Sequence, residues 1–226
     1  MKKLKFRPRA VIFDMDGVIV DSMPYHFLAW YEALRPYGIR VSCFDIYSKE
    51  GERWEKTLKF FLKRKRLKFS DRIIKRIFGA RRRIFRNKFK KLTFKGAREF
   101  LACLDKNGYM LGLVTGTPQK EVREILPKSI ERIFDCIVSG DHVKKGKPHP
   151  EPYLEAARIL GVRPGECVVV ENAPFGIEAA KRAGMYCIAL TTSLPREYLK
   201  EADMVVESLE EISYLMDKSC RLVLAT

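Results

Sequence analysis

The chain has 226 residues, of which 46% are hydrophobic and 32% charged, with a formal net charge of +16 at pH 7. These values fit one globular domain, or a core with one inserted subdomain, and they exclude collagen-like and wholly disordered chains. No apolar stretch reaches the roughly 18 residues of a membrane span, because Asp14, Asp16 and Asp21 interrupt the best candidate. The basic start is followed by an apolar run of only Ala10 to Phe13, which is too short for a signal peptide. We therefore expect a cytoplasmic protein that does not enter a membrane.

The rarer residue types carry two further predictions. The six cysteines include no C-x-x-C pair and several lie in apolar runs, which indicates reduced, packed thiols rather than a disulfide framework or a zinc site. Amide side chains are scarce beside abundant Lys, Arg and Glu, a composition typical of a thermophilic source.

The first predicted strand, Ala10–Asp14, leads directly into Asp14-Met15-Asp16-Gly17. Asp and Gly are ordinary turn residues, so a simple turn is one interpretation. Two carboxylates at the end of a buried strand also suit a nucleophile or metal ligand, Asp14, beside an acid/base, Asp16.

A strongly basic insert follows. Residues 49–91 hold 19 Lys+Arg and four acids, whereas the rest of the chain holds 25 basic and 24 acidic residues. Apolar residues recur in it at helical spacing, first as Trp54, Leu58, Phe61 and Leu62 and then as Ile73, Ile74, Ile77 and Phe78. This pattern predicts a small helical unit with basic outer faces.

The surface of the insert has three interpretations. It is a solvated, thermophile-like surface, or it steers acidic substrates toward a cleft. The third is a nucleic-acid-binding module, for which Phe60, Phe61, Phe69 and Phe85 alternate with basic residues. Their helical spacing suits a core better than a base-stacking platform.

Beyond the insert, short apolar runs alternate with helical ones. Strands are predicted at 110–115, 133–139, 167–170, 187–190 and 204–206, and helices at 97–104, 120–125, 152–160, 175–183 and 209–216. Near-continuous apolar strands between helices predict an α/β fold with a doubly wound, Rossmann-like parallel sheet. Ligands of such sheets bind beyond the carboxyl ends of the strands.

Polar residues follow three of these later strands. Thr115 and Gly116 open a helix and could bind an anion through the hydroxyl and free backbone N–H groups. Lys147, in a loop rich in proline, could hold a charge in place, with a solvated lysine as the alternative. Glu171 and Asn172 end a buried strand and offer oxygen ligands that suit Mg²⁺.

Four polar segments thus follow one another along the chain: Asp14 with Asp16, Thr115 with Gly116, Lys147, and Glu171 with Asn172. In this order they resemble the motifs of the haloacid dehalogenase superfamily of phosphohydrolases and phosphomutases. The resemblance covers essentially the whole chain and is closest to the branch that contains β-phosphoglucomutase and phosphoglycolate phosphatase. It implies a core domain over residues 1–21 and 94–226 and an inserted, all-helical cap over residues 22–93.

The resemblance also implies a role for each aspartate of the first motif. Asp14 would attack the phosphoryl group and become an aspartyl phosphate, with its other oxygen on Mg²⁺. Asp16 would protonate the leaving oxygen and then activate the incoming water, while its backbone carbonyl binds the metal.

The later motifs would complete the site. Thr115 and the amide of Gly116 would hold the transferring phosphoryl oxygens, and Lys147 would neutralise charge beside the nucleophile. Glu171 and Asn172 would complete the metal shell, directly or through water. The family usually has a second acid at the place of Asn172, so we expect weaker metal binding here.

Substrate selection would fall to the cap. His26, four residues before Trp30, matches a β-phosphoglucomutase position that helps hold the general acid/base, although both residues could simply pack their helix. Gly51 and Arg53 stand two apart rather than three as in the mutase, which weakens the mutase interpretation. Arg82 lies near the place of the family's cap cation for the non-transferring phosphate.

We therefore predict a Mg²⁺-dependent phosphatase that hydrolyses a small phosphorylated metabolite of the sugar phosphate or phosphoglycolate type through an aspartyl phosphate. The alternative is a β-phosphoglucomutase-like phosphosugar mutase. A nucleic-acid-binding module on a phosphatase frame is the third and least favoured hypothesis, and we expect a monomer without a nucleic-acid partner.

Overall fold

The computed structural model describes residues 7–65 and 70–216 of the chain. Its named strands form one parallel sheet in the order β3-β2-β1-β4-β5-β6. They are β1 (Ala10–Asp14), β2 (Met110–Val114), β3 (Cys136–Val138), β4 (Cys167–Glu171), β5 (Tyr186–Leu190) and β6 (Met204–Val206). The predicted doubly wound α/β fold is confirmed.

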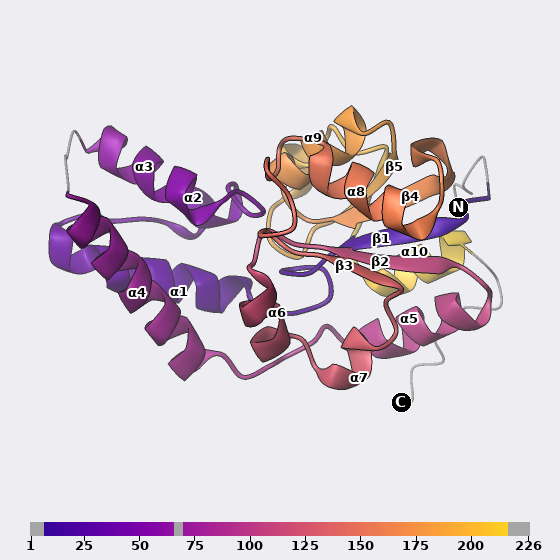
Figure 1. The fold of residues 1–226 in the computed structure, drawn as a ribbon, viewed down its shortest axis with the longest axis horizontal. Coiled ribbons are helices and arrows are strands. Elements are labelled where there is room, and N and C mark those ends of the chain that lie inside the picture. The colour runs from indigo at the N-terminus through magenta and orange to yellow at the C-terminus, as the bar shows by residue number, and fades with distance from the viewer. Residues whose placement is uncertain (1–6, 66–69, 217–226) are drawn as a thin grey trace.

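Helices cover both faces of this sheet (Figure 1). Residues of α5 (Ala97–Lys106), α6 (Gln119–Ile125), α7 (Lys128–Glu131) and α10 (Leu209–Met216) pack into a hydrophobic cluster on one face. Residues of α8 (Glu151–Leu160) and α9 (Pro174–Arg182) pack into the cluster on the other face. Both faces are therefore buried, which explains why the strand sequences are almost continuously apolar.

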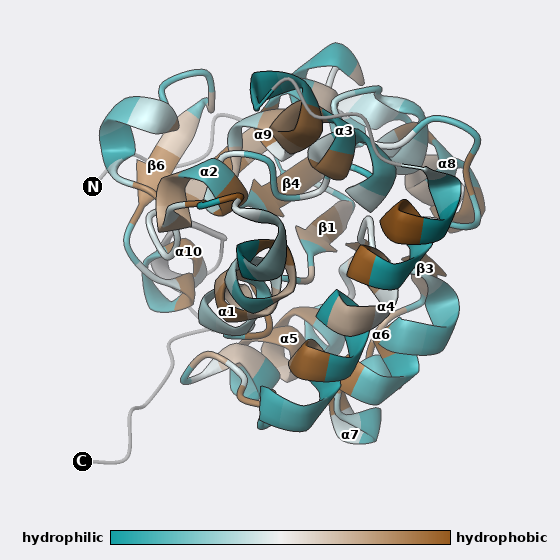
Figure 2. Ribbon diagram, turned by 90° about the vertical axis from the view of Figure 1, so that its left-hand side faces the viewer, coloured by the Kyte–Doolittle hydropathy of each residue, from teal (hydrophilic) through white to brown (hydrophobic). Residues whose placement is uncertain are grey.

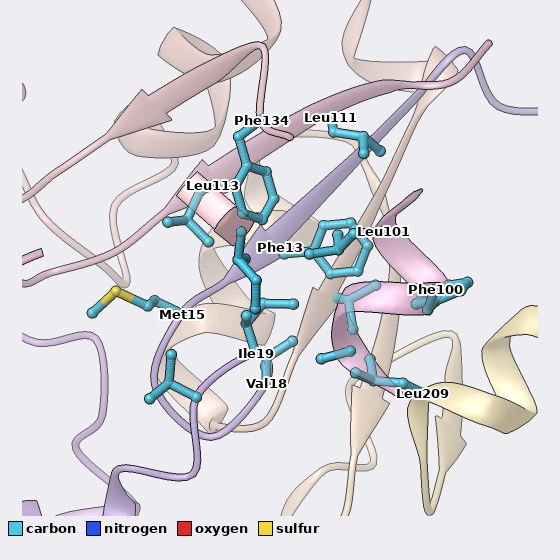
Figure 3. Packing of buried hydrophobic residues seen from close by; sticks show 14 of the residues in the cluster. Phe13, Met15, Val18, Ile19, Phe100, Leu101, Leu111, Leu113, Phe134 and Leu209 are labelled. Atoms are coloured by element: carbon cyan, nitrogen blue, oxygen red, sulfur yellow. The ribbon is translucent and has the colours of Figure 1, made fainter. Parts of the chain in front are cut away.

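Phe13 shows how the first face is filled. Its ring meets Phe100 of α5 and Phe134 edge-on, at centroid distances of 6.0 and 6.2 Å (Figure 3). Complete burial of such a side chain contributes about 1.5–3 kcal/mol. The strand that ends at Asp14 is thus held rigidly from both sides.

A second, all-helical layer stands apart from the sheet (Figure 1). It consists of α1 (Met23–Leu34), α2 (Cys43–Tyr47), α3 (Trp54–Arg64) and α4 (Asp71–Lys88), with 3₁₀ turn η1 (Arg35–Tyr37) after α1. It has its own core, which includes Trp30, Leu34, Leu58, Phe61 and Ile77. We call this layer the cap; its boundaries at 22 and 93 remain a prediction.

Along α4 apolar and polar segments alternate around the helix, as Figure 2 shows.

The aromatic residues of the cap bear on the nucleic-acid hypothesis. Phe61 is fully buried and Phe85 is 5% exposed, so neither can stack on a base. Phe60 is half exposed, and Phe69 lies outside the described residues.

Most predicted elements agree with the structure to within two residues, but one strand is shorter than expected. Residues 133–135, predicted as strand, instead continue the turn after α7, where the backbone N–H of Ile133 donates to Ile130. The carboxylate of Asp135 then accepts from the backbone N–H of Leu111 at 2.7 Å, so that β3 begins only at Cys136. The side chain and the backbone N–H of Asp135 thus both join this residue to Leu111 of the neighbouring strand.

The structure also bears on two other expectations, one about the cysteines and one about membrane spans. Cys136, Cys167 and Cys187 are buried free thiols, whereas Cys103 is disulfide-bonded, so the prediction of reduced thiols is wrong at that residue. Among the described residues, none of the helices has the length and apolar character needed to cross a membrane.

Candidate active site

The polar residues that end β1, β2 and β4 meet at one edge of the sheet. Asp14 ends β1, Thr115 follows β2, and Glu171 and Asn172 end β4, with β1 lying between the other two strands. All four side chains are buried. Parallel strands bring their carboxyl ends to a common edge, so the juxtaposition follows from the topology.

Lys147 reaches into this edge from the loop before α8. Its Nζ donates to Asp14 Oδ1 at 2.5 Å, to Glu171 Oε1 at 2.6 Å and to the backbone carbonyl of Val114 at 3.4 Å. Burial alone would lower the pKa of Lys147, but Asp14 and Glu171 outweigh it and raise the pKa. Lys147 is therefore a fixed, buried positive charge beside Asp14.

In this ion pair, Asp14 is the partner whose charged form is disfavoured by its surroundings. Burial raises its pKa well above the usual value, Lys147 opposes this, and the nearby carboxylates of Glu171 and Asp16 add to the rise. The Oδ2 atom of Asp14 is buried and has no hydrogen-bond partner among the described residues. The carboxylate thus has one oxygen on Lys147 and one oxygen free.

Asp16 is held by three residues from both layers, one of which is itself held by Arg81. Its Oδ1 accepts from Ser22 Oγ at 2.5 Å and lies 3.0 Å from His26 Nε2, and its Oδ2 accepts from Thr117 Oγ1 at 3.3 Å. Arg81 Nη2 lies 2.8 Å from His26 Nδ1. A guanidinium only donates, so Nδ1 accepts and the ring proton is on Nε2, which donates to Asp16.

This chain of hydrogen bonds sets the charge of Asp16. Burial raises its pKa, but the interactions with His26 and Ser22 outweigh burial and place the pKa below the usual value. Asp16 is therefore a carboxylate in this arrangement. Since His26 and Arg81 belong to the cap, docking of the cap on the core supports the ionised form.

Two buried oxygens at this edge fit a divalent cation. Asn172 Nδ2 donates to Ser193 Oγ at 2.8 Å, and Asn172 Oδ1 is buried without a partner among the described residues. Asp14 Oδ2 is likewise buried without a hydrogen-bond partner among the described residues. Two orphaned, buried oxygens, one anionic and one neutral, are the donors that Mg²⁺ prefers, so the residues fit the ion.

Glu171 is arranged differently from the other predicted ligands. Its Oε1 accepts from Lys147 and Tyr153, and its Oε2 accepts from the backbone N–H groups of Asn172 and Ala173. A carboxylate has about four acceptor positions, and protein donors occupy four here. No cluster of three or more His, Cys, Asp or Glu side chains suited to a metal occurs in the described part of the chain.

Glycines allow the segments to approach this closely. A Cβ at Gly17, whose φ is +85°, would lie 2.0 Å from Asn172 Nδ2. In the cap loop, a Cβ at Gly51 would lie 2.6 Å from Lys147 Cδ, and a Cβ at Gly116 would lie 2.9 Å from the Gly51 carbonyl. The cap loop therefore sits directly on this edge of the core.

A cavity lies between the cap and this edge. Its cap wall carries the aromatic residues Trp30, Trp54 and Phe78 and the charged residues Lys49, Glu50, Glu52 and Arg81, while Gly116 and Thr117 belong to the core wall. Burial raises the pKa of Glu50, and the neighbouring His26 and Arg81 oppose that rise. The loop of Gly116 and Thr117 at this edge thus forms one wall of a polar cavity whose other walls carry aromatic residues.

The structure brings together most of the predicted site residues, but two cap arginines lie elsewhere. Asp14, Asp16, Thr115, Lys147, Glu171 and Asn172 share one edge, and His26 and Gly116 line the cavity. Arg53 donates to the backbone carbonyls of Val143 and Gly140 outside the cavity. Arg82 forms an ion pair with Glu121 at 2.8 Å, and its neighbour Arg81 lines the cavity instead.

Sequence reasoning missed several residues that hold this site. Ser22 and Thr117 each lie close in sequence to a recognised motif, so their hydroxyls could have been identified from the sequence as candidate site residues. Ser193 and Tyr153 carry no such signal, since each acts on a motif residue that is distant in sequence.

Comparison with known proteins now identifies the family. The family described as "Haloacid dehalogenase-like hydrolase" matches residues 11–190. The chain is 37% identical over 184 residues to "Phosphorylated carbohydrates phosphatase" of Thermotoga maritima, covering 78% of this chain and 82% of that protein. It is 33% identical to "Hexitol phosphatase A" of Escherichia coli, with coverage of 92% and 94%.

A solved structure agrees with this assignment. The putative β-phosphoglucomutase from Bacteroides vulgatus superimposes with a TM-score of 0.82 and 32% sequence identity, covering 96% of this chain and 91% of that one. The sequence match and the shared fold lead to one conclusion: this chain belongs to the haloacid dehalogenase-like hydrolases.

Proposed function

We propose that the protein is a Mg²⁺-dependent phosphatase that hydrolyses a phosphorylated sugar or sugar alcohol through an aspartyl phosphate on Asp14. The observation that carries the proposal is the buried Asp14–Lys147 pair beside Asp16, whose hydrogen-bond partners His26 and Thr117 line the cavity under the cap. The phosphorylated-carbohydrate and hexitol phosphatases among the relatives support the same substrate class.

Asp14 performs the nucleophilic step. One of its oxygens attacks phosphorus, a new O–P bond forms, and the bond from phosphorus to the sugar oxygen breaks. Lys147 offsets the repulsion between the anionic nucleophile and the anionic phosphoryl group. Mg²⁺, held by Asp14, Asn172 and the backbone carbonyl of Asp16, would neutralise charge on the phosphoryl oxygens when bound.

Asp16 moves the protons. In its protonated form it gives a proton to the departing sugar oxygen, and the resulting carboxylate accepts a proton from the water that attacks the aspartyl phosphate. The hydrogen bonds with His26 and Ser22 stabilise that carboxylate and lower the pKa of Asp16. Thr115 and the Gly116 amide would orient the phosphoryl oxygens at the start of the loop before α6.

The cavity walls indicate a polyhydroxylated leaving group. Glu50 and Glu52 can accept hydrogen bonds from hydroxyls, while Trp30 and Trp54 present apolar ring surface to the carbon skeleton. Arg81 and Lys49 keep the cavity attractive to a phosphate ester.

The alternative is a phosphosugar mutase of the β-phosphoglucomutase type. One observation favours it: the cap residue His26 binds Asp16 directly, so the acid/base is organised by the same layer that would hold a sugar. In that reaction a sugar hydroxyl, rather than water, takes the phosphoryl group from Asp14.

The test uses a panel of hexose and hexitol phosphates with Mg²⁺, and it follows free phosphate release. Asp14→Asn should abolish release, and Asp21→Asn, which removes an acid from the same segment, should not. β-Glucose 1-phosphate is followed by NMR in parallel. Isomer without free phosphate would establish the mutase, and turnover that persists in Asp14→Asn would refute the covalent route.

A further inference from the structure

A second hollow lies at the seam between the cap and the core. It has a volume of about 350 Å³, and the described residues that line it are all different from those that line the catalytic cavity. Its cap wall carries Arg53 and Lys56, and its core wall carries Lys144, Lys145, His149 and Arg182. This size falls at the lower end of small-molecule sites. We call it the basic crevice.

The charge of the basic crevice is largely uncompensated. Among the described residues, no acidic side chain lines it. Arg182 pairs with Glu178 at 3.0 Å, and His149 lies 3.9 Å from Glu151. Within the part of the chain that the structure describes, Lys56, Lys144 and Lys145 have no ion pair. Three lysines from two layers therefore line one hollow without an ion pair to residues 7–65 or 70–216, and the nearby Glu151 carboxylate accepts from the backbone N–H groups of Lys144 and Lys145.

Overall composition does not account for this convergence. Outside residues 49–91 the chain has 25 basic and 24 acidic residues, so the core is nearly neutral. Yet the core residues that face the cap at this point are all cationic or uncharged. Like charges repel when the fold assembles them, and an external anion relieves that repulsion.

The basic crevice is also connected to the catalytic edge. Its core wall includes the loop of Lys144, Lys145 and Gly146, and the next residue, Lys147, turns inward to Asp14. A Cβ at Gly146 would lie 3.3 Å from Arg53 Cγ, so the two walls touch there. An anion in the crevice would contact the cap and the lysine loop together.

We propose that the basic crevice binds a small multivalent anion of the diphosphate type, which bridges the cap to the core and stabilises the closed arrangement. A monovalent ion would leave most of the lysine charge uncompensated, whereas neighbouring phosphate groups can contact lysines of both walls. The binding site is separate from the catalytic cavity, so the proposal does not depend on the substrate.

The test is calorimetric titration with methylenediphosphonate, whose P–C–P bond phosphatases do not hydrolyse. EDTA is present to remove divalent cations, and NaCl is kept at about 50 mM to limit screening. Lys144→Gln/Lys145→Gln should bind at least about tenfold more weakly than the original chain. The matched control is Lys128→Gln/Arg132→Gln, two core residues outside the crevice, which should stay within about twofold.

Two further variants locate the bound anion. Thr115→Val impairs the catalytic anion site and should leave this binding unchanged. Lys56→Gln removes charge from the cap wall and should weaken binding about threefold, unlike Lys59→Gln, which lies on the same helix outside the crevice.

Several results would overturn the proposal. These are no binding up to about 5 mM ligand, equal losses in both double variants, or binding lost in Thr115→Val alone. An effect of the core lysines without any effect of Lys56→Gln would refute the bridge. Because none of these measurements requires turnover, an inactive enzyme leaves the test intact.

Discussion

Replacement of Lys147 by methionine gives the sharpest test of the electrostatics of the site. The change keeps a long side chain in the same space and removes the charge shared by Asp14 and Glu171. Each of the two charge-assisted hydrogen bonds contributes about 1.5–3 kcal/mol, and loss of one partner from a buried ion pair costs about 3–5 kcal/mol. At pH 8 we therefore expect unfolding to require about 3–5 kcal/mol less free energy.

The penalty should depend on pH in a defined direction. Without Lys147, burial and the neighbouring carboxylates raise the pKa of Asp14 in the folded state further above its unfolded value. Groups raised in this way add stability at low pH and lose it as the pH rises through the folded-state pKa. The loss of unfolding free energy in Lys147→Met should thus be smaller at pH 5 than at pH 8.

The assay is urea unfolding at both pH values, with EDTA present so that no cation replaces the lysine. Urea is preferred to guanidinium because it does not screen charges. Lys128→Met, which removes a lysine remote from the catalytic edge, is the control. A deficit of the same size at pH 5 and pH 8 would show that packing rather than charge accounts for the loss.

Three other variants test separate parts of the site. Asn172→Asp adds a negative charge to the cation ligands and should lower the Mg²⁺ dissociation constant about tenfold by calorimetry. Gly116→Ala places a Cβ 2.9 Å from the Gly51 carbonyl, so the cap must shift; we expect kcat/KM to fall at least about tenfold. Arg81→Gln frees the tautomer of the histidine on Asp16, so the pKa of Asp16 should rise and the alkaline limb of the kcat/KM profile, which follows loss of the proton that Asp16 donates, should move to higher pH.

Each of these has a control or a contradicting result. An unchanged Mg²⁺ affinity in Asn172→Asp would mean that this side chain does not contact the ion. Gly79→Ala adds a Cβ on α4 with nothing within 4 Å and should leave kcat/KM unchanged. Arg83→Gln removes an exposed arginine from the same helix and should leave the pH profile in place; an equal shift would indicate a general charge effect.

The parallel sheet could be predicted because its determinants are local. Strands buried on both faces need continuous apolar runs, and β1 and β4 show them as Ala10–Phe13 and Cys167–Val170. The order of polar residues after the strands was likewise visible in the chain. The resemblance to a known family rested on that order, and the comparisons confirm the family.

The orientation of individual side chains could not be read in the same way. Neighbouring residues on a helix point about 100° apart, so Arg81 and Arg82 face different surroundings, although both pair with Glu121. Packing of α4 against α1 turns Arg81 toward His26 and leaves Arg82 with Glu121. Neither arginine is distinguished by its sequence neighbours.

The sequence by itself determined the fold class, and it singled out Asp14, Asp16 and Lys147, because each lies in a short, recognisable segment between elements of the sheet and its helices. Tertiary structure alone decided how those groups are charged and directed. Glu171 is held by Lys147 and Tyr153 instead of standing free, and Asn172 is turned by Ser193. These contacts join residues far apart in the chain, and their energies arise only when burial removes water from between them.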